Sequence, residues 1–245
     1  MKSDHFGLVS QINVKESVSW DRVFLTLDID WAHDEVLEDT IELIRPFGAK
    51  VTWYATHPTL LLDEIRRVTD WELGIHPNFN PLLEGKGGES ATDIVQRLMS
   101  MVPEARSVRS HSIVQSSRLN QIFLSAGLTH DSNDYVPSHS GIELRPFKLE
   151  DGLIKVPYHF SDELWCLGRW PREDFDVLLR RPGMRVFDFH PIHVFLNTEN
   201  LERYQATRAL HRTPHELIKH RYDGFGTRDR LKQLLSSLNE SSELG

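Results

Sequence analysis

The segment VFLTLDID (23–30) alternates apolar and other side chains with the two-residue period of a β-strand, and it ends in two carboxylates. The apolar residues of one face are Val23, Leu25, Leu27 and Ile29. Residues 33–49 follow with apolar side chains at helical spacing, and Pro46 and Gly48 mark the end of that helix. A strand followed at once by a helix is the repeating unit of a parallel α/β sheet.

The same order of strand and helix recurs along the chain. Further strands are predicted over 50–56, 71–76, 105–111, 127–132, 153–160 and 184–190. Helices are predicted over 58–68, around 94–99, over 119–126, 172–180 and 201–210, and at Leu231, Leu234, Leu235 and Leu238 near the C-terminus. About seven such units predict an α/β barrel or near-barrel, although residues 133–183 are less regular. Because no linker or repeat is visible, we expect one domain over residues 1–245, with its core over 20–200 and C-terminal helices over 201–238.

Composition excludes several classes of protein. The formal net charge of -8, from 28 basic and 36 acidic residues, does not predict a nucleic-acid-binding surface. The single cysteine, Cys166, excludes an intrachain disulfide and a cysteine-based zinc site. The first residues, MKSDHFGLVSQINVK, lack the apolar core of a signal peptide, and no apolar run approaches about 18 residues. We therefore expect no membrane span and a cytoplasmic location.

Polar side chains gather at the ends of five predicted strands. These are Asp28 and Asp30; His76, with Asn80 four residues on; Arg109 and His111; Asp131 and Asp134; and Asp188 and His190, followed by His193. In a parallel α/β barrel the active site lies at the carboxyl ends of the strands, so we expect these side chains to meet. An Asp in this place often caps the following helix instead, and each residue alone is a weak signal. The joint pattern favours a catalytic site.

Asp28 and Asp30 are two residues apart on a strand and so point to the same face. Two adjacent carboxylates repel each other unless a cation or a shared proton lies between them. Carboxylate and imidazole ligands together suit a divalent ion such as zinc. One Asp would bind the ion while the other acts as a base on water, which predicts metal-dependent hydrolysis.

The order and spacing of these residues resemble the polysaccharide deacetylase family, also called the NodB-homology or family-4 carbohydrate esterase family. The five motifs of the family are matched by LTLDID (25–30), WELGIHPNFNP (71–81), VRSH (108–111), HDSNDY (130–135) and VFDFHPIH (186–193). The match spans residues 20–200 and is greatest to the cytoplasmic branch associated with O-antigen or other surface-polysaccharide biosynthesis. The resemblance implies an α/β fold of NodB type, a distorted (β/α)7 barrel.

The resemblance also implies a role for individual residues. Asp28 would be the general base, Arg109 the residue that holds it, and His190 the general acid. Asp30, His76 and Asn80 would bind one divalent ion, most simply zinc, with nickel and cobalt as alternatives.

One departure from the family pattern leaves the ligand set open. Asn80 stands where the family has a second histidine, so the third ligand could come instead from His111, His193 or His33. Trp31, His111 and His193 are weaker predictions for substrate contact.

The implied reaction is hydrolysis of the N-acetyl amide of an acetamido sugar, releasing acetate and a free amine. The sugar would be carried by a nucleotide, a lipid or an oligosaccharide. Two alternatives stay open: a hydrolase of another linear or cyclic amide, and a catalytically inactive member that binds sugar.

Overall fold

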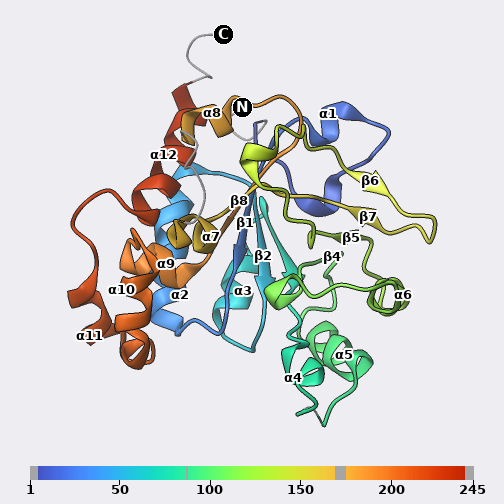
Figure 1. Ribbon diagram of the computed structural model, residues 1–245, viewed down its shortest axis with the longest axis horizontal. Helices are drawn as coiled ribbons and strands as arrows, with labels where there is room; N and C mark the ends of the chain where they lie inside the picture. Colours follow the sequence, from blue (N-terminus) through green and yellow to red (C-terminus); the bar gives the residue numbers. More distant parts are fainter. Residues whose placement is uncertain (1–4, 87, 169–174, 241–245) are drawn as a thin grey trace.

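The computed structural model describes residues 5–86, 88–168 and 175–240. In this part of the chain a nine-stranded sheet lies at the centre, in the order β6-β7-β5-β4-β3-β2-β1-β9-β8 (Figure 1). Its strands are β1 (Val23–Asp28), β2 (Val51–Ala55), β3 (Trp71–Ile75), β4 (Ser107–Val108), β5 (His130–Asp131), β6 (Phe147–Lys148), β7 (Ile154–Lys155), β8 (Phe160–Ser161) and β9 (Arg185–Phe189). Neighbouring strands are parallel, except that β6 pairs antiparallel with β7.

One segment joins the two sides of the curled sheet. β7 pairs with β5, and β8, a few residues later, pairs with β9. If residues 154–161 are counted once and β6 is left out, the described parallel strands occupy seven positions, β1 to β5, 154–161 and β9. The prediction of a distorted seven-stranded α/β barrel is therefore confirmed.

The two faces of β1 show how the sequence builds both the core and the site. Leu25 and Leu27 are fully buried and pack with Ile41 of the following helix in the main hydrophobic cluster. Thr26 and Asp28 point the other way, toward Arg109 in the barrel interior. Because successive side chains of a strand alternate between faces, the same short segment supplies apolar packing outside and polar groups inside.

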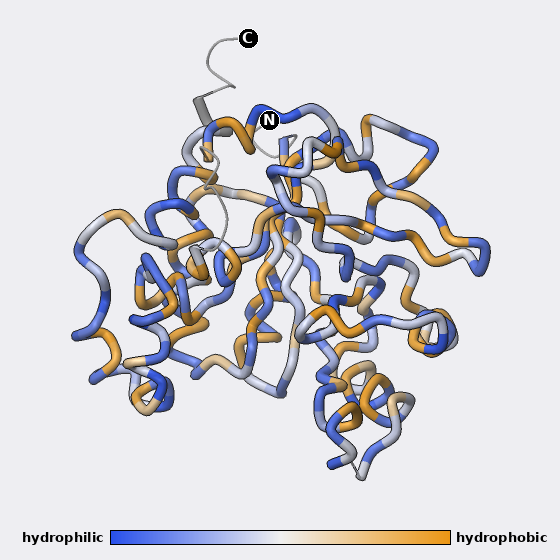
Figure 2. The backbone as a smooth tube through the Cα atoms, viewed as in Figure 1, coloured by the Kyte–Doolittle hydropathy of each residue, from blue (hydrophilic) through white to orange (hydrophobic). Residues whose placement is uncertain are grey.

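Helices surround the sheet (Figure 1). The α-helices are α1 (Ser17–Trp20), α2 (Asp34–Ile44), α3 (Leu61–Arg66), α4 (Asn80–Leu83), α5 (Ala91–Met101), α6 (Ser117–Ser125), α7 (Asp162–Leu167), α8 (Phe175–Leu179), α9 (Pro191–Leu196), α10 (Leu201–Ala206), α11 (Pro214–Leu217) and α12 (Thr227–Glu240). The 3₁₀ helices are η1 (Val9–Gln11), η2 (Arg45–Phe47), η3 (His111–Ile113), η4 (Ser138–Ser140), η5 (Arg208–Leu210) and η6 (Ile218–His220). α9 packs against both α2 and α12. Apolar residues recur along the central strands and at intervals along the helices, as packing on both sides of the sheet requires (Figure 2).

Some predicted elements differ from the observed ones. β4 and β5 are shorter than predicted, with two residues each. The predicted strand 153–160 divides into β7 and β8. Residues 172–174 of the predicted helix 172–180, and the side chain of Leu238, lie outside the described residues.

Among the described residues, no helix combines the length and the apolar composition that a bilayer crossing requires. Cys166 is buried, and its Sγ lies 3.6 Å from Thr198 O. The single-domain organisation stays a prediction.

Candidate active site

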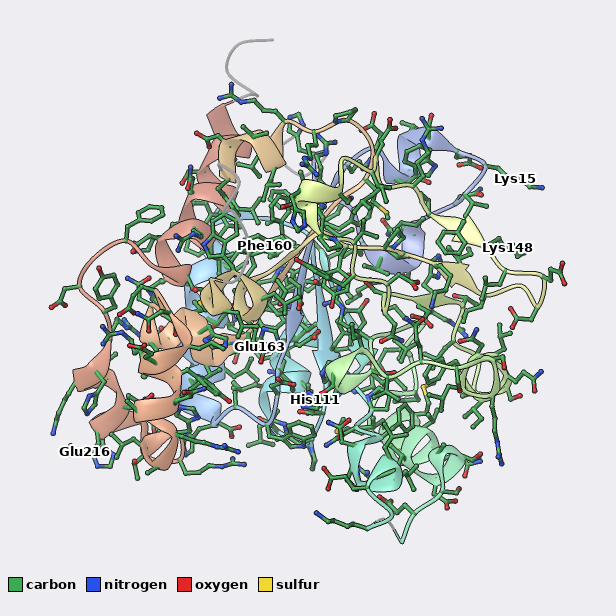
Figure 3. All side chains as sticks on the ribbon, in the orientation of Figure 1. Lys15, His111, Lys148, Phe160, Glu163 and Glu216 are labelled. Atoms are coloured by element: carbon green, nitrogen blue, oxygen red, sulfur yellow. The ribbon has the colours of Figure 1, made fainter. Side chains whose placement is uncertain are left out.

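Several of the predicted strand-end side chains meet at the carboxyl ends of the central strands, where His111 is labelled in Figure 3. Asp28 and Asp30 come from the end of β1, His76 from β3, His111 from η3 after β4, and His190 from the residue between β9 and α9. Parallel strands bring their carboxyl ends to one rim, so residues far apart in sequence become neighbours there.

Three ligand atoms at this rim form a nearly equilateral triangle. Asp30 Oδ1 lies 3.2 Å from His76 Nε2 and 3.2 Å from His111 Nδ1, and the two nitrogens are 3.3 Å apart. Ligand atoms at about 2.0–2.1 Å from a tetrahedral zinc ion are about 3.3–3.4 Å from one another. One carboxylate and two imidazoles are also donors that zinc, nickel and cobalt accept. The residues present therefore fit one divalent ion.

Two left-handed turns present these ligands. Asp30 and Trp31 have φ values of 41° and 53°, and the Trp31 backbone N–H donates to Thr56 Oγ1 at 3.0 Å. Ser112 and Ile113, directly after His111, have φ values of 55° and 50°. Residues other than glycine in this region cost about 1–3 kcal/mol each, and such strain is concentrated at functional sites.

Charges in the triangle are strongly coupled. Burial raises the pKa of Asp30, but hydrogen bonds from His111 and His76 outweigh it, so that the pKa is well below its usual range. Burial lowers the pKa of His76, but the carboxylates of Asp28 and Asp30 outweigh it, and the pKa is raised. The carboxylates of Asp28 and Asp30 thus favour a positive charge beside them, as a bound cation would supply.

Arg109 lies beneath this rim and is 1% exposed. Its Nη1 donates to Asp28 Oδ1 at 3.1 Å, to Thr26 Oγ1 at 2.9 Å and, more closely, to Asp188. Its guanidinium lies between the rings of Tyr54 and Tyr158, at 4.8 and 4.5 Å from their centroids. This enclosure fixes the orientation of the Asp28 carboxylate.

Asp188 is the second carboxylate on Arg109. Burial raises its pKa to about 8, against the lowering effect of Arg109. Burial therefore favours its neutral form, although Asp188 is the carboxylate that lies closer to Arg109. The strand-end pattern found Asp188 but assigned it no role.

His190 pairs with a carboxylate that the sequence reasoning missed. Its Nδ1 lies 2.7 Å from Asp162 Oδ1, and its backbone N–H donates to Asp162 Oδ2 at 2.9 Å. Burial lowers the pKa of His190, but Asp162 outweighs it, and the pKa is well above its usual value. Nε2 faces the triangle, 3.7 Å from Asp30 Oδ2. Asp162 comes just after the predicted strand 153–160, so the strand-end rule would have found it.

Other predicted residues lie elsewhere. The side-chain amide of Asn80 contacts the turn after His111, where Nδ2 donates to Ser112 Oγ at 3.0 Å. His193 is 3% exposed, and its Nδ1 lies 3.2 Å from Thr198 Oγ1, so it is covered rather than open to a substrate. His33 caps α2 by accepting from the Glu35 N–H.

Trp31 and the fourth motif also have defined places. The Trp31 ring meets His111 edge-on, with centroids 5.2 Å apart, and it is partly exposed at the rim. Asp131 and Asp134 both contact the buried Lys155 at 3.0 Å, which ties the end of β5 to β7. Asp131 and Asp134 therefore have a structural role, in which they bind the ammonium group of Lys155.

Comparison with known proteins shows the family of this chain. The model of the family of WbmS-like polysaccharide deacetylases matches residues 25–208. WbmS of Bordetella bronchiseptica, a crystal structure provisionally described as a polysaccharide deacetylase involved in O-antigen biosynthesis, is 44% identical, with a TM-score of 0.92. The match covers 96% of this chain and 98% of that chain.

More distant structures add no argument. A family 4 carbohydrate esterase from Streptomyces lividans is 11% identical, with a TM-score of 0.46, over 87% of this chain and 88% of that chain. No curated protein matches the chain. The family match over most of the chain and the extensive likeness to WbmS agree: this chain belongs to the WbmS-like polysaccharide deacetylase family.

Proposed function

We propose that the chain hydrolyses the N-acetyl amide of an acetamido sugar in the biosynthesis of an O-antigen-like polysaccharide, with one divalent ion held by Asp30, His76 and His111. The observation that carries the proposal is the ligand triangle, with Asp28, held by Arg109, and His190 both beside it. His190 Nε2 lies 4.0 Å from Asp28 Oδ2 and 3.7 Å from Asp30 Oδ2. The description of WbmS as an O-antigen enzyme supports the choice of pathway.

The residues divide the chemistry between a base and an acid. A bound ion would polarise the amide carbonyl and a water molecule. Asp28, held by Arg109, accepts a proton as the water attacks the carbonyl carbon. His190, kept protonated by Asp162, donates a proton from Nε2 to the departing nitrogen as the C–N bond breaks. The products are acetate and the amino sugar.

Trp31 is the residue we propose for sugar contact. Its indole is partly exposed at the rim and stands edge-on against the ligand His111. Sugar rings pack well on aromatic faces, so the exposed face of the indole would set the substrate beside the triangle.

The test measures acetate release and metal content together. Protein stripped with a chelator and reloaded with zinc, nickel or cobalt is offered acetamido sugars linked to a nucleotide, a lipid or an oligosaccharide. We expect acetate only from the reloaded protein. Sugar binding without acetate release by loaded protein would favour the binding alternative, and cleavage of small cyclic amides alone would favour the other hydrolase.

Matched variants test the ligand set. His111→Gln should lose the bound ion, because it removes one corner of the triangle, whereas His193→Gln should keep it. Elemental analysis after gel filtration gives the stoichiometry. Retention of one ion per chain in His111→Gln would refute its role as a ligand.

A further inference from the structure

We propose that Asn80 is a positioning residue for the metal centre: through Ser112 it holds the turn that presents His111. This inference rests on the proposed function, since it takes His111 as a ligand. It assigns Asn80 a contact with a residue next to the ligand in place of direct coordination.

The turn that carries His111 is one that its own residues do not favour. η3 contains two consecutive residues in the left-handed region, Ser112 (φ 55°, ψ 25°) and Ile113 (φ 50°). Neither is glycine, and a β-branched side chain such as that of Ile113 rarely adopts this conformation. A turn of this kind persists only where its surroundings hold it.

Backbone and side-chain contacts hold the turn on two sides. On the side of the sheet, Ser110 N–H donates to Asn133 Oδ1 at 2.8 Å, and His111 N–H donates to Pro77 O at 2.9 Å. On the outer side, Asn80 Nδ2 donates to Ser112 Oγ at 3.0 Å and so contacts the left-handed pair itself. The backbone of Asn80 is in turn anchored, because its N–H donates to Asn78 Oδ1 at 3.0 Å.

His111 depends on this support more than His76 does. The side chain of His76 is 2% exposed and is fixed by the core around β3, whereas that of His111 is 29% exposed. A partly exposed ligand is oriented mainly by its backbone, so a looser turn would move Nδ1 away from Asp30.

The first experiment measures zinc affinity by competition with a chromophoric chelator. Asn80→Ala and Ser112→Ala should each weaken binding by about tenfold, the lower end of the range for residues that orient metal ligands. The double variant should lose no more than either single variant, because both remove the same contact. Ser117→Ala, an exposed serine at the start of α6, is the control and should bind as wild type does. Unchanged affinity in Ser112→Ala would overturn the proposal, as would further loss in the double variant.

The second experiment needs no metal. Hydrogen exchange of the metal-free protein follows the Ile113 amide, which donates to Ser110 O at 2.8 Å within the turn. In Asn80→Ala it should exchange roughly fivefold faster, the factor expected for loss of one ordinary hydrogen bond. If wild type binds no metal, the proposed function fails while this measurement still decides whether Asn80 holds the turn. Unchanged exchange overturns the inference, and so does faster exchange with unchanged zinc affinity.

Discussion

The buried imidazole of His159 is predicted to stay neutral in the folded protein, and this can be tested by its effect on stability at different pH. Its side chain is 4% exposed, and neither ring nitrogen has a hydrogen-bond partner in the described part of the chain. The ring packs on Phe187, with centroids 5.3 Å apart, beside a cavity of about 40 Å³. Burial, with Arg181 and Arg185 nearby, lowers the pKa of His159 to about 3. The imidazole is therefore buried in its neutral form.

The size of the effect follows from the two pKa values. In the unfolded chain His159 titrates near its ordinary value of 6.5, and in the folded chain near 3. Between these values the unfolded state binds more protons, so the free energy of unfolding falls as the pH falls. At pH 5, about 1.5 units below the unfolded pKa, protonation of His159 in the unfolded state lowers the free energy of unfolding by about 2 kcal/mol. At pH 7 the same effect is almost zero.

Urea unfolding of wild type and His159→Phe at pH 7 and pH 5 measures this contribution. The phenyl ring keeps the packing on Phe187 and cannot be protonated, so the difference in unfolding free energy should shift by about 2 kcal/mol in favour of the variant at pH 5. His215→Phe, at a side chain that is 74% exposed, is the control. Equal differences at the two pH values would show that His159 is not held neutral, and the reasoning would be refuted.

Three further predictions concern groups that contact the proposed base and acid or share their cation. Asp162→Asn should lower kcat by about 10²–10³, because His190 loses the carboxylate that keeps it protonated, while elemental analysis should show unchanged metal content. Loss of the ion would contradict this role. Arg109→Met should lower the free energy of unfolding by about 3–5 kcal/mol, because Asp28 is left as a buried carboxylate without a cation. Asp188→Asn should cost about 1 kcal/mol or less at pH 7, because burial already favours the neutral form of Asp188. Urea unfolding at pH 7 checks both, and equal losses would contradict a neutral Asp188.

The strand-end pattern predicted much of the rim because its basis is geometric. Asp28 ends β1 and His76 follows β3, two strands with clear apolar periodicity, and Arg109 follows the short β4, which pairs with β3. Parallel pairing of β1 to β4 brings those ends together. The family match confirms the predicted class, a polysaccharide deacetylase-type hydrolase. The metal ion, the acetamido sugar and the cytoplasmic location stay predictions.

The turn after His111 and the division of strand 153–160 could not be predicted from the periodicity of apolar residues. No pattern of residue types predicts that Ser112 and Ile113 adopt left-handed backbone, yet this turn brings His111 to the triangle and Asn80 to Ser112. Likewise β7 and β8 have two residues each, too few to show a period of two. That is why the predicted strand 153–160 appeared as one element.

The seam between β1 and β9 has a consequence for how the protein acquires activity. Thr26 of β1 bonds to Phe187 of β9 across 161 residues of sequence, so this pairing is among the contacts that form with the largest loss of chain entropy. Asp28 ends one of these strands and His190 follows the other. A nascent chain that ends before residue 184 would contain Asp30, His76 and His111 but no acid. In the proposed reaction, amide cleavage would therefore require the β1–β9 pairing to have formed, whereas metal binding would not.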